Sequence, residues 1–170
     1  GKVLYVFKDP TRDREYADFS EIPYTVIAAV LAAEDESFFS HKGLDYLGAI
    51  NGAFTTISSG GENTVGGSTI TQQLVKQTLL SNERTIDRKA KEAIIAIMVE
   101  QKYSKEEILE LYLNTTSYGG RVTGIKTAAR TYFNKSWKDV TLNEAAFLVG
   151  LVQSPGEYSP LFASNRGRAE

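Results

Sequence analysis

Cysteine is absent from this 170-residue sequence, and histidine, methionine and tryptophan each occur once. The absence of cysteine excludes disulfide bonds, thiolate zinc sites and a cysteine nucleophile. A single histidine excludes a metal site built from several histidines. The 21 acidic and 19 basic residues nearly balance, and the net charge of −2 disfavours a strongly basic protein that binds nucleic acid.

Long apolar runs are missing as well. No stretch reaches the roughly 18 apolar residues of a membrane span. The longest uncharged stretch, residues 46–61, contains glycine, asparagine, serine and threonine. The pattern Ser-x-x-Lys does not occur, which excludes a serine acyl-transfer centre of that type. The remaining composition, 42% apolar and 24% charged, is that of one globular domain, which we expect to cover residues 1–170.

Charge is unevenly distributed along the chain. Residues 9–45 carry nine acids and three bases, whereas residues 76–105 carry seven bases and four acids. Two oppositely charged segments in a small domain either face a shared ligand or form separate solvated surfaces, and charge alone leaves both interpretations open.

Apolar periodicity and capping patterns predict a mainly α-helical protein. The patterns Ser104–Glu107 and Thr141–Glu144 are capping boxes, and Ser68 is expected to be an N-cap. In the longest predicted helix, one side carries Ala90, Ile94, Ile97, Met98 and Gln101. The predicted helices cover approximately residues 20–33, 45–54, 69–80, 86–102, 105–114, 124–133 and 142–152, and a short extended run covers 3–7.

Three stretches carry side chains suited to chemistry. Glu34, Asp35 and Glu36 follow an apolar helix, and a carboxyl beside apolar groups suits a general base. The competing interpretation is a set of solvated acids beside a structural histidine. A Gly-Gly-Ser-Thr turn at 66–69 opens the next helix, where backbone N–H groups suit an anion or a sugar. The alternative is an ordinary capped helix, and the glycine spacing excludes a phosphate-binding P-loop.

The densest cationic stretch is 84–92. Arg88, Lys91 and Glu92 share one face of the predicted helix. A salt-bridged surface helix is one interpretation. Binding of a phosphorylated ligand is the other, and it gains support from the acidic and glycine-rich stretches.

Five motifs in order resemble the peptidoglycan glycosyltransferase domain of class A penicillin-binding proteins and of monofunctional transglycosylases. The resemblance covers nearly all of residues 20–160. The motifs are Glu34-Asp35-x-x-Phe38-x-x-His41-x-Gly43, the run from Gly67 to Lys76, Arg88-Lys89-x-x-Glu92 with Glu100, the run from Lys105 through Glu110 and Tyr112 to Asn114, and the region from Gly124 to Pro155.

The resemblance implies a lysozyme-like, mainly α fold, with a large helical lobe and a small mobile jaw lobe at about 46–65 that touches the bilayer. We expect this chain to contain neither the family's N-terminal membrane anchor nor a C-terminal transpeptidase domain. The implied place of action is the extracytoplasmic face of the bacterial cytoplasmic membrane.

The implied reaction joins lipid II units into β-1,4-linked glycan strands, with inversion and release of undecaprenyl pyrophosphate. By motif match, Glu34 is the general base, and Glu92 orients cations or helps to hold Mg²⁺ or Mn²⁺. No cofactor is required by the sequence. The implied ligands are donor and acceptor lipid II, the growing glycan and the inhibitor moenomycin. The implied substrate-binding residues are Ser68, Gln72, Gln73, Lys76, Arg84, Arg88 and Lys91.

Further motif residues are expected to shape the site rather than to react. They are Asp35, Phe38, His41, Gly43, Glu100, Glu110, Tyr112 and Asn114. Two other functions stay open at this point. A lysozyme-like hydrolase uses carboxylates but needs little cationic charge. A catalytically silent module that binds lipid II or glycan would need neither Glu34 nor Glu92.

Overall fold

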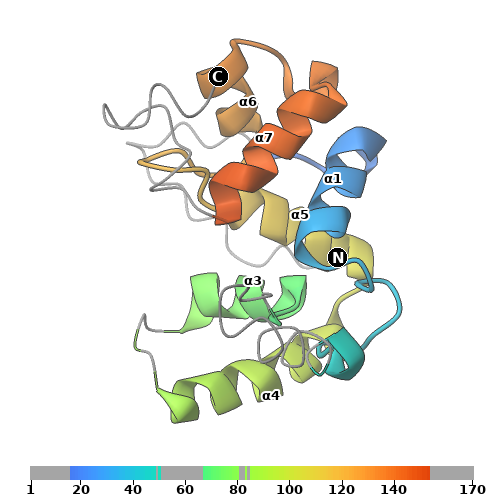
Figure 1. The fold of residues 1–170 in the computed structure, drawn as a ribbon, viewed down its shortest axis with the longest axis vertical. Coiled ribbons are helices and arrows are strands. Elements are labelled where there is room, and N and C mark those ends of the chain that lie inside the picture. Colours follow the sequence, from blue (N-terminus) through green and yellow to red (C-terminus); the bar gives the residue numbers. More distant parts are fainter. Residues whose placement is uncertain (1–15, 49, 51–66, 81–82, 84, 154–170) are drawn as a thin grey trace.

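The computed structural model describes residues 16–48, 50, 67–80, 83 and 85–153. These residues are mainly helical, which confirms the predicted fold class (Figure 1). Within them, the only pairing of extended backbone is an isolated antiparallel bridge between Ser117 and Thr123. The elements in chain order are η1 (Phe19–Glu21), α1 (Tyr24–Glu34), α3 (Ile70–Leu79), α4 (Ile86–Lys102), α5 (Lys105–Thr115), α6 (Ile125–Phe133), η2 (Trp137–Asp139) and α7 (Leu142–Gln153).

Most of the observed helices agree closely with those predicted. The bounds of α4 are those expected from the sequence. Helix α1 begins after the expected start at 20–23, because residues 19–21 form η1, and it ends one residue later than expected. Residues 49 and 51–54 of the predicted helix at 45–54 lie outside the described residues. The predicted extended run at 3–7 lies outside the described residues. So does the predicted jaw, 46–65, apart from residues 46–48 and 50.

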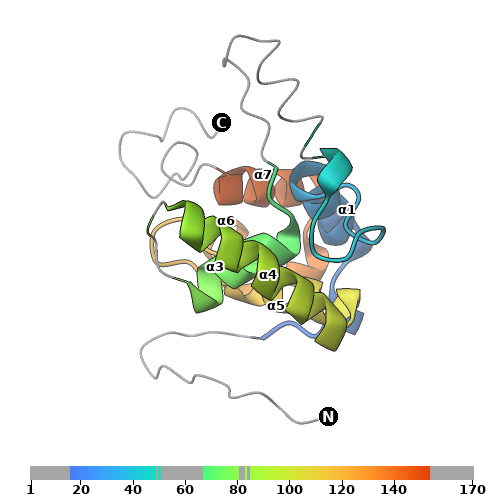
Figure 2. The same cartoon turned by 90° about the horizontal axis from the view of Figure 1, so that it is seen from below.

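Helix α5 forms the centre of the fold. Ile108, Leu109 and Leu113 have no exposed surface, and Tyr112 is 1% exposed. Burial of each such aliphatic side chain stabilises the fold by about 1.5–3 kcal/mol. Helix α3 packs against α5 on one side and against α4 on the other, so the three helices form a layered stack (Figures 1 and 2).

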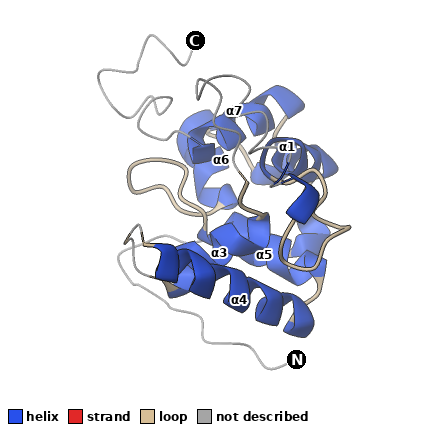
Figure 3. Cartoon of the chain, turned by 60° about the horizontal axis from the view of Figure 1, so that its bottom comes forward, coloured by secondary structure: helices blue, strands red, loops and turns tan. Residues whose placement is uncertain are grey.

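Helices α1 and α7 form a second packing unit. Both helices are rich in alanine, valine and leucine, and they pack along each other (Figure 3). Val26 and Val30 of α1, and Leu148 and Leu151 of α7, are buried. Helix α1 begins after Pro23, whose fixed φ suits the start of a helix, and it ends at Glu34. This packing fixes where the carboxyl end of α1 lies.

Side-chain caps define the starts of several helices. The predicted capping box of Ser104 and Glu107 is present at the start of α5. The prediction that Ser68 caps α3 is wrong, because Thr69 is the N-cap. Thr69 accepts a hydrogen bond from the backbone of Gln72, and the Gln72 side chain accepts one from the backbone of Thr69. This reciprocal pair satisfies two backbone donors and leaves Ser68 one residue before the cap.

Helix α4 presents two different faces. Glu92 and Ala96 are buried on the inner face. The side that carries Ala90, Ile94 and Met98 is exposed instead, with Ile94 at 60% and Met98 at 61%. Among the described residues, no helix has the length and apolar character needed to cross a bilayer.

The start of α7 carries a pH-sensitive cap. Glu144 accepts hydrogen bonds from the backbone and hydroxyl of Thr141, and Lys135 donates to it at 2.7 Å. The bond from Lys135, followed by those from Thr141, lowers the pKa of Glu144 from 4.5 to about 2. A carboxyl whose pKa is lowered by folding stabilises the fold above its unfolded pKa, and this contribution is lost as the pH falls through the folded pKa.

We therefore predict that Glu144→Gln lowers the thermal unfolding temperature at pH 7, and that the difference from the parent shrinks between about pH 4.5 and pH 2. Calorimetry over this pH range measures the effect. Glu106→Gln is the matched control, because Glu106 lies exposed in the first turn of α5 but outside its capping box. A difference between parent and Glu144→Gln that stays constant down to pH 2 would contradict the assignment.

Candidate active site

Glu34 ends α1 with its two carboxylate oxygens in different surroundings. Oε2 accepts a hydrogen bond of 2.8 Å from Nε2 of Gln73 on α3. Oε1 is buried and has no hydrogen-bond partner within the part of the chain that the structure describes. A buried polar atom without a partner is unusual and points to a functional site. One oxygen of Glu34 is therefore fixed, and the other retains its lone pairs.

Two tyrosines lie beside Glu34. The hydroxyl of Tyr112 on α5 donates to Oε1 of Gln73 at 3.1 Å. Burial, and then the charge of Glu34, raise the pKa of Tyr112 and of Tyr118 well above the ordinary tyrosine value. Both phenols therefore stay protonated at neutral pH, so neither adds a second negative charge beside Glu34.

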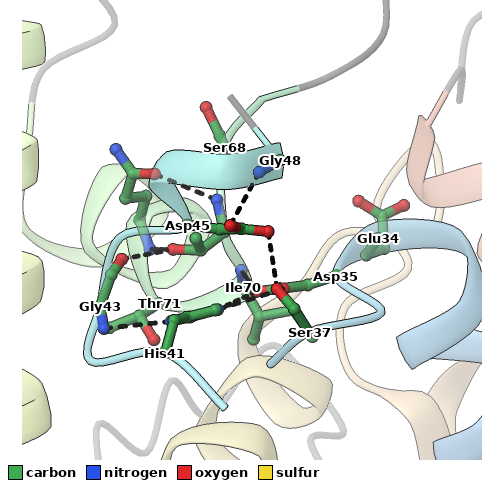
Figure 4. A network of polar contacts seen from close by, with 12 residues as sticks. Glu34, Asp35, Ser37, His41, Gly43, Asp45, Gly48, Ser68, Ile70 and Thr71 are labelled. Carbon is green, nitrogen blue, oxygen red and sulfur yellow. Dashed lines mark hydrogen bonds and ion pairs between the residues drawn. The ribbon is translucent and has the colours of Figure 1, made fainter. Parts of the chain in front are cut away.

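Asp35 points away from its neighbour Glu34 and into a separate set of contacts (Figure 4). Its Oδ2 accepts a hydrogen bond of 3.0 Å from the backbone N–H of Ile70, the first residue of α3. The same oxygen accepts one of 2.9 Å from Nε2 of His41. A carboxylate at a helix N-terminus is favoured by the helix dipole. Asp35 therefore joins the end of α1 to the start of α3.

The loop after α1 is fixed by His41, Gly43 and Thr69. Nδ1 of His41 accepts the backbone N–H of Gly43 at 3.2 Å, so the ring proton lies on Nε2 and is donated to Asp35. The hydroxyl of Thr69 donates to the carbonyl of Gly43 at 2.7 Å. Gly43 has a φ of +95°, and a Cβ there would come within 3.0 Å of the backbone of Ala96 on α4. Glycine is required at this close approach.

Glu92 organises a second polar cluster. Its carboxylate is 1% exposed. Arg88 donates to Oε2 at 2.6 Å, and Lys89 donates to Oε1. Nε2 of Gln72 donates a longer hydrogen bond, of 3.4 Å, to Oε1 of Glu92. The ammonium group of Lys89 also donates to the hydroxyl of Ser68 at 2.7 Å. The structure thus brings Ser68, Gln72, Arg88 and Glu92 together, as their motifs suggested.

The predicted cations are not all in this cluster. Lys76 and Lys91 are exposed, and Arg84 lies outside the described residues. Lys89, which was not among the predicted binding residues, takes the place beside Glu92. Its spacing of three residues before Glu92 is a signal that could have identified it. Roles in substrate binding for Lys76, Arg84 and Lys91 stay predictions.

The remaining motif residues make supporting contacts. Glu100 accepts from Thr71 and from Lys105, whose ammonium lies 4.3 Å from the ring centroid of Phe38. Asn114 exchanges two hydrogen bonds of 2.8 Å with the backbone of Ala17. Glu110 accepts from the Tyr16 hydroxyl and from the Phe19 backbone. These contacts join the helices and bind residues 16–19 to α5.

The surroundings of Glu92 do not fit a metal ion. Each of its oxygens already accepts a hydrogen bond from a cationic side chain. A further cation would be repelled by Arg88 and Lys89. In the described part of the chain, no group of three or more His, Asp or Glu residues is arranged to hold a metal. In this structure, Glu92 forms ion pairs with Arg88 and Lys89.

Comparison with known proteins adds independent evidence. The model of the family described as Transglycosylase matches residues 1–170, which is the whole chain. The chain belongs to the transglycosylase family.

Several curated relatives of this transglycosylase domain are penicillin-binding proteins. It is 44% identical to penicillin-binding protein 1A of Rickettsia felis, over 94% of this chain and 20% of that protein. It is 44% identical to penicillin-binding protein 1A of Haemophilus influenzae, over 86% of this chain and 17% of that protein. It is 42% identical to penicillin-binding protein 1F of Bacillus subtilis, over 93% of this chain and 22% of that protein. The chain thus spans about a fifth of the length of these relatives.

The burial of Glu92 leads to a prediction about stability. We expect Glu92→Gln to lower the free energy of unfolding by about 2 kcal/mol, since hydrogen bonds to charged groups contribute roughly 1.5–3 kcal/mol each and Lys89 can turn to solvent. Urea unfolding with an unchanged m-value measures this loss.

The matched control is Glu36→Gln, because Glu36 is exposed. Surface substitutions of that kind change stability by less than about 0.5 kcal/mol. Equal effects of the two variants would show that the Glu92 cluster contributes nothing to the fold.

Proposed function

We propose that this domain is a peptidoglycan glycosyltransferase that polymerises lipid II. In the proposed reaction, the 4-hydroxyl of the acceptor sugar attacks the anomeric carbon of a lipid-linked donor. The new β-1,4 bond forms with inversion, and undecaprenyl pyrophosphate leaves. The observation that carries the proposal is that Gln73 and Gln72, neighbours on α3, contact two different groups. One is a carboxylate with a buried oxygen that has no partner among the described residues, and the other is a cation cluster held by a buried glutamate.

Glu34 is the proposed general base. The attacking hydroxyl must lose its proton as the new bond forms, and a positioned base contributes about 10²–10⁴-fold in rate. Asp35 does not suit this role, because its carboxylate accepts from the Ile70 backbone and from His41. Glu34 is the carboxylate of this motif with an oxygen that is not used in holding the fold.

The cations near Glu92 are proposed to stabilise the leaving pyrophosphate. Pyrophosphate departs as an anion and needs positive charge rather than a proton donor. Arg88 and Lys89 lie in the first turns of α4, where the helix dipole adds to their charge. Lys76, Arg84 and Lys91 are additional candidates for this role. Ser68 and Gln72 are candidates for contacts with sugar or phosphate oxygens.

The alternatives receive less support from this geometry. A hydrolase must protonate a sugar leaving group, which needs an undissociated acid. Glu92 accepts from two cations, an arrangement that suits a carboxylate and not a protonated acid. A module that only binds glycan has no use for a buried carboxylate oxygen without a partner.

The outer face of α4 supports association with the membrane surface. Ile86, Ile94 and Met98 are 88%, 60% and 61% exposed and recur along one side of the helix. Lys91 and Lys102 are also exposed on α4. An apolar stripe beside lysines suits a bilayer interface with anionic lipids. We propose that the domain acts at the extracytoplasmic face of the bacterial cytoplasmic membrane.

We also propose that moenomycin competes with lipid II for the donor site.

The first test is polymerisation of lipid II by the purified protein in detergent, read on a glycan gel. We expect the parent to form polymer and Glu34→Gln to be slower by at least about 10²-fold, because the base is lost. Glu36→Gln, two residues further along, should retain activity within about threefold. Polymer from Glu34→Gln at the parent rate would remove Glu34 from the mechanism, and no polymer from the parent would contradict the proposed function.

A second test compares two neighbouring lysines of α4. Lys89 is held between Glu92 and Ser68, whereas Lys91 is exposed. We expect Lys89→Ala to lower the polymerisation rate by about 10–100-fold, and Lys91→Ala to lower it by a smaller factor. The opposite ranking would assign the pyrophosphate contact to Lys91. Moenomycin affinity, measured on the same variants, reports on the donor site without turnover.

A further inference from the structure

A chain of hydrogen bonds connects three helices at the proposed base. The Tyr112 hydroxyl on α5 donates to Oε1 of Gln73 on α3, at 3.1 Å. Nε2 of Gln73 donates to Oε2 of Glu34 at the end of α1, at 2.8 Å. Neither the sugar-binding role expected for Gln73 nor the packing role expected for Tyr112 accounts for this connection.

The directions of these bonds follow from the groups on Tyr112 and Glu34. Burial and the charge of Glu34 raise the pKa of the Tyr112 phenol, so the hydroxyl keeps its proton and donates it to the amide oxygen of Gln73. A carboxylate only accepts, so the amide nitrogen faces Glu34. An inverted amide would place its oxygen against the carboxylate and would remove the acceptor of the Tyr112 proton. Tyr112 and Glu34 together set which way Gln73 points.

The Gln73 amide has little capacity left for a substrate. Its oxygen accepts from Tyr112, and its nitrogen donates to Glu34 and, over 3.5 Å, to the carbonyl of Ser68. The second lone pair of the amide oxygen is open to a sugar hydroxyl, but a sugar that accepts from the amide nitrogen would have to displace one of its partners. The contacts therefore favour a role for Gln73 toward Glu34.

The consequence for Glu34 is a distinction between its two oxygens. Oε2 is occupied by Gln73, whereas Oε1 is buried and has no partner among the described residues. Oε1 offers both of its lone pairs to an arriving proton, whereas one lone pair of Oε2 already accepts from Gln73. Rotation of the carboxylate would exchange the two oxygens, and the bond from Gln73 opposes that rotation.

We propose that Tyr112 is a positioning residue that acts through Gln73, and that Oε1 of Glu34 is the atom that takes the proton. This inference rests on the proposed function. In that reaction, the acceptor O–H bond breaks and its proton moves to Oε1. The acceptor oxygen forms the bond to the anomeric carbon, and the bond from that carbon to the pyrophosphate oxygen breaks with its electron pair leaving on pyrophosphate.

The test uses Tyr112→Phe, which removes the hydroxyl and keeps the ring. We expect kcat for lipid II polymerisation to fall about tenfold, which is part of the rate contribution of a positioned base. We expect KM to change by less than about twofold. Tyr16→Phe is the matched control, because it also removes a hydroxyl that donates to a glutamate, at Glu110, which lies two residues before Tyr112 and about 200° around α5. Thermal unfolding of both variants establishes that they are folded.

A second variant, Gln73→Glu, places another carboxyl against Glu34. Two carboxyls that share a site oppose each other's ionisation. We expect the acidic limb of the pH profile of kcat to move to higher pH by about one unit or more. Carbon-13 NMR of the glutamate carboxyls, with Glu34 assigned through Glu34→Gln, should show the same upward displacement of the Glu34 titration without any turnover.

The outcomes separate the two proposals. Polymer from the parent, with Tyr112→Phe no slower than Tyr16→Phe, would overturn the positioning role and leave the proposed function intact. An unmoved Glu34 titration in Gln73→Glu would also overturn it, whether or not the parent polymerises lipid II. An inactive parent with a displaced titration would contradict the proposed function and support the connection between Gln73 and Glu34.

Discussion

The carboxylate of Asp35 is the junction on which the candidate site depends. It accepts the first N–H of α3 and the ring N–H of His41 at the point where α1 ends. Two helices separated by more than 30 residues of sequence are thereby placed end to end. Glu34 comes one residue before this junction and Gln73 three residues after Ile70. The bond between Asp35 and the start of α3 therefore brings the side chains of Glu34 and Gln73 into contact.

Much of the fold could be predicted from local patterns, because capping and periodicity act within one or two turns of a helix. The capping boxes at Ser104 and Thr141 are examples. The local pattern places the N-cap of α3 at Ser68, one residue too early, since serine and threonine are both good N-caps. Thr69 is placed by its bond to Gly43, a contact across 26 residues that no local pattern contains.

The contacts within the site were less predictable, because they also join residues that are far apart in the sequence. The motif resemblance identified Glu34, Glu92 and their neighbours, but partners depend on how helices meet. Gln72 and Gln73 are adjacent and chemically identical, yet one joins the cap and Glu92 while the other joins Glu34 and Tyr112. Lys89 and Lys91 differ only by their angle on α4, and that angle brings Lys89 to Glu92. The packing of α3 between α4 and α5 decides the partners of the two glutamines. The spacing along α4 decides the case of the two lysines.

The attachment of residues 16–19 to α5 has a mechanical consequence. Asn114 and Glu110 hold this segment through four hydrogen bonds that act side by side, two to the Ala17 backbone and two from Tyr16 and Phe19. Parallel bonds share a load and must break together. Tension applied to the chain before Tyr16 therefore acts on all four bonds to α5 at once, and the first residues do not detach one at a time. Since Tyr112 lies between the two anchoring residues, a pull on that end of the domain reaches the tyrosine that orients Gln73.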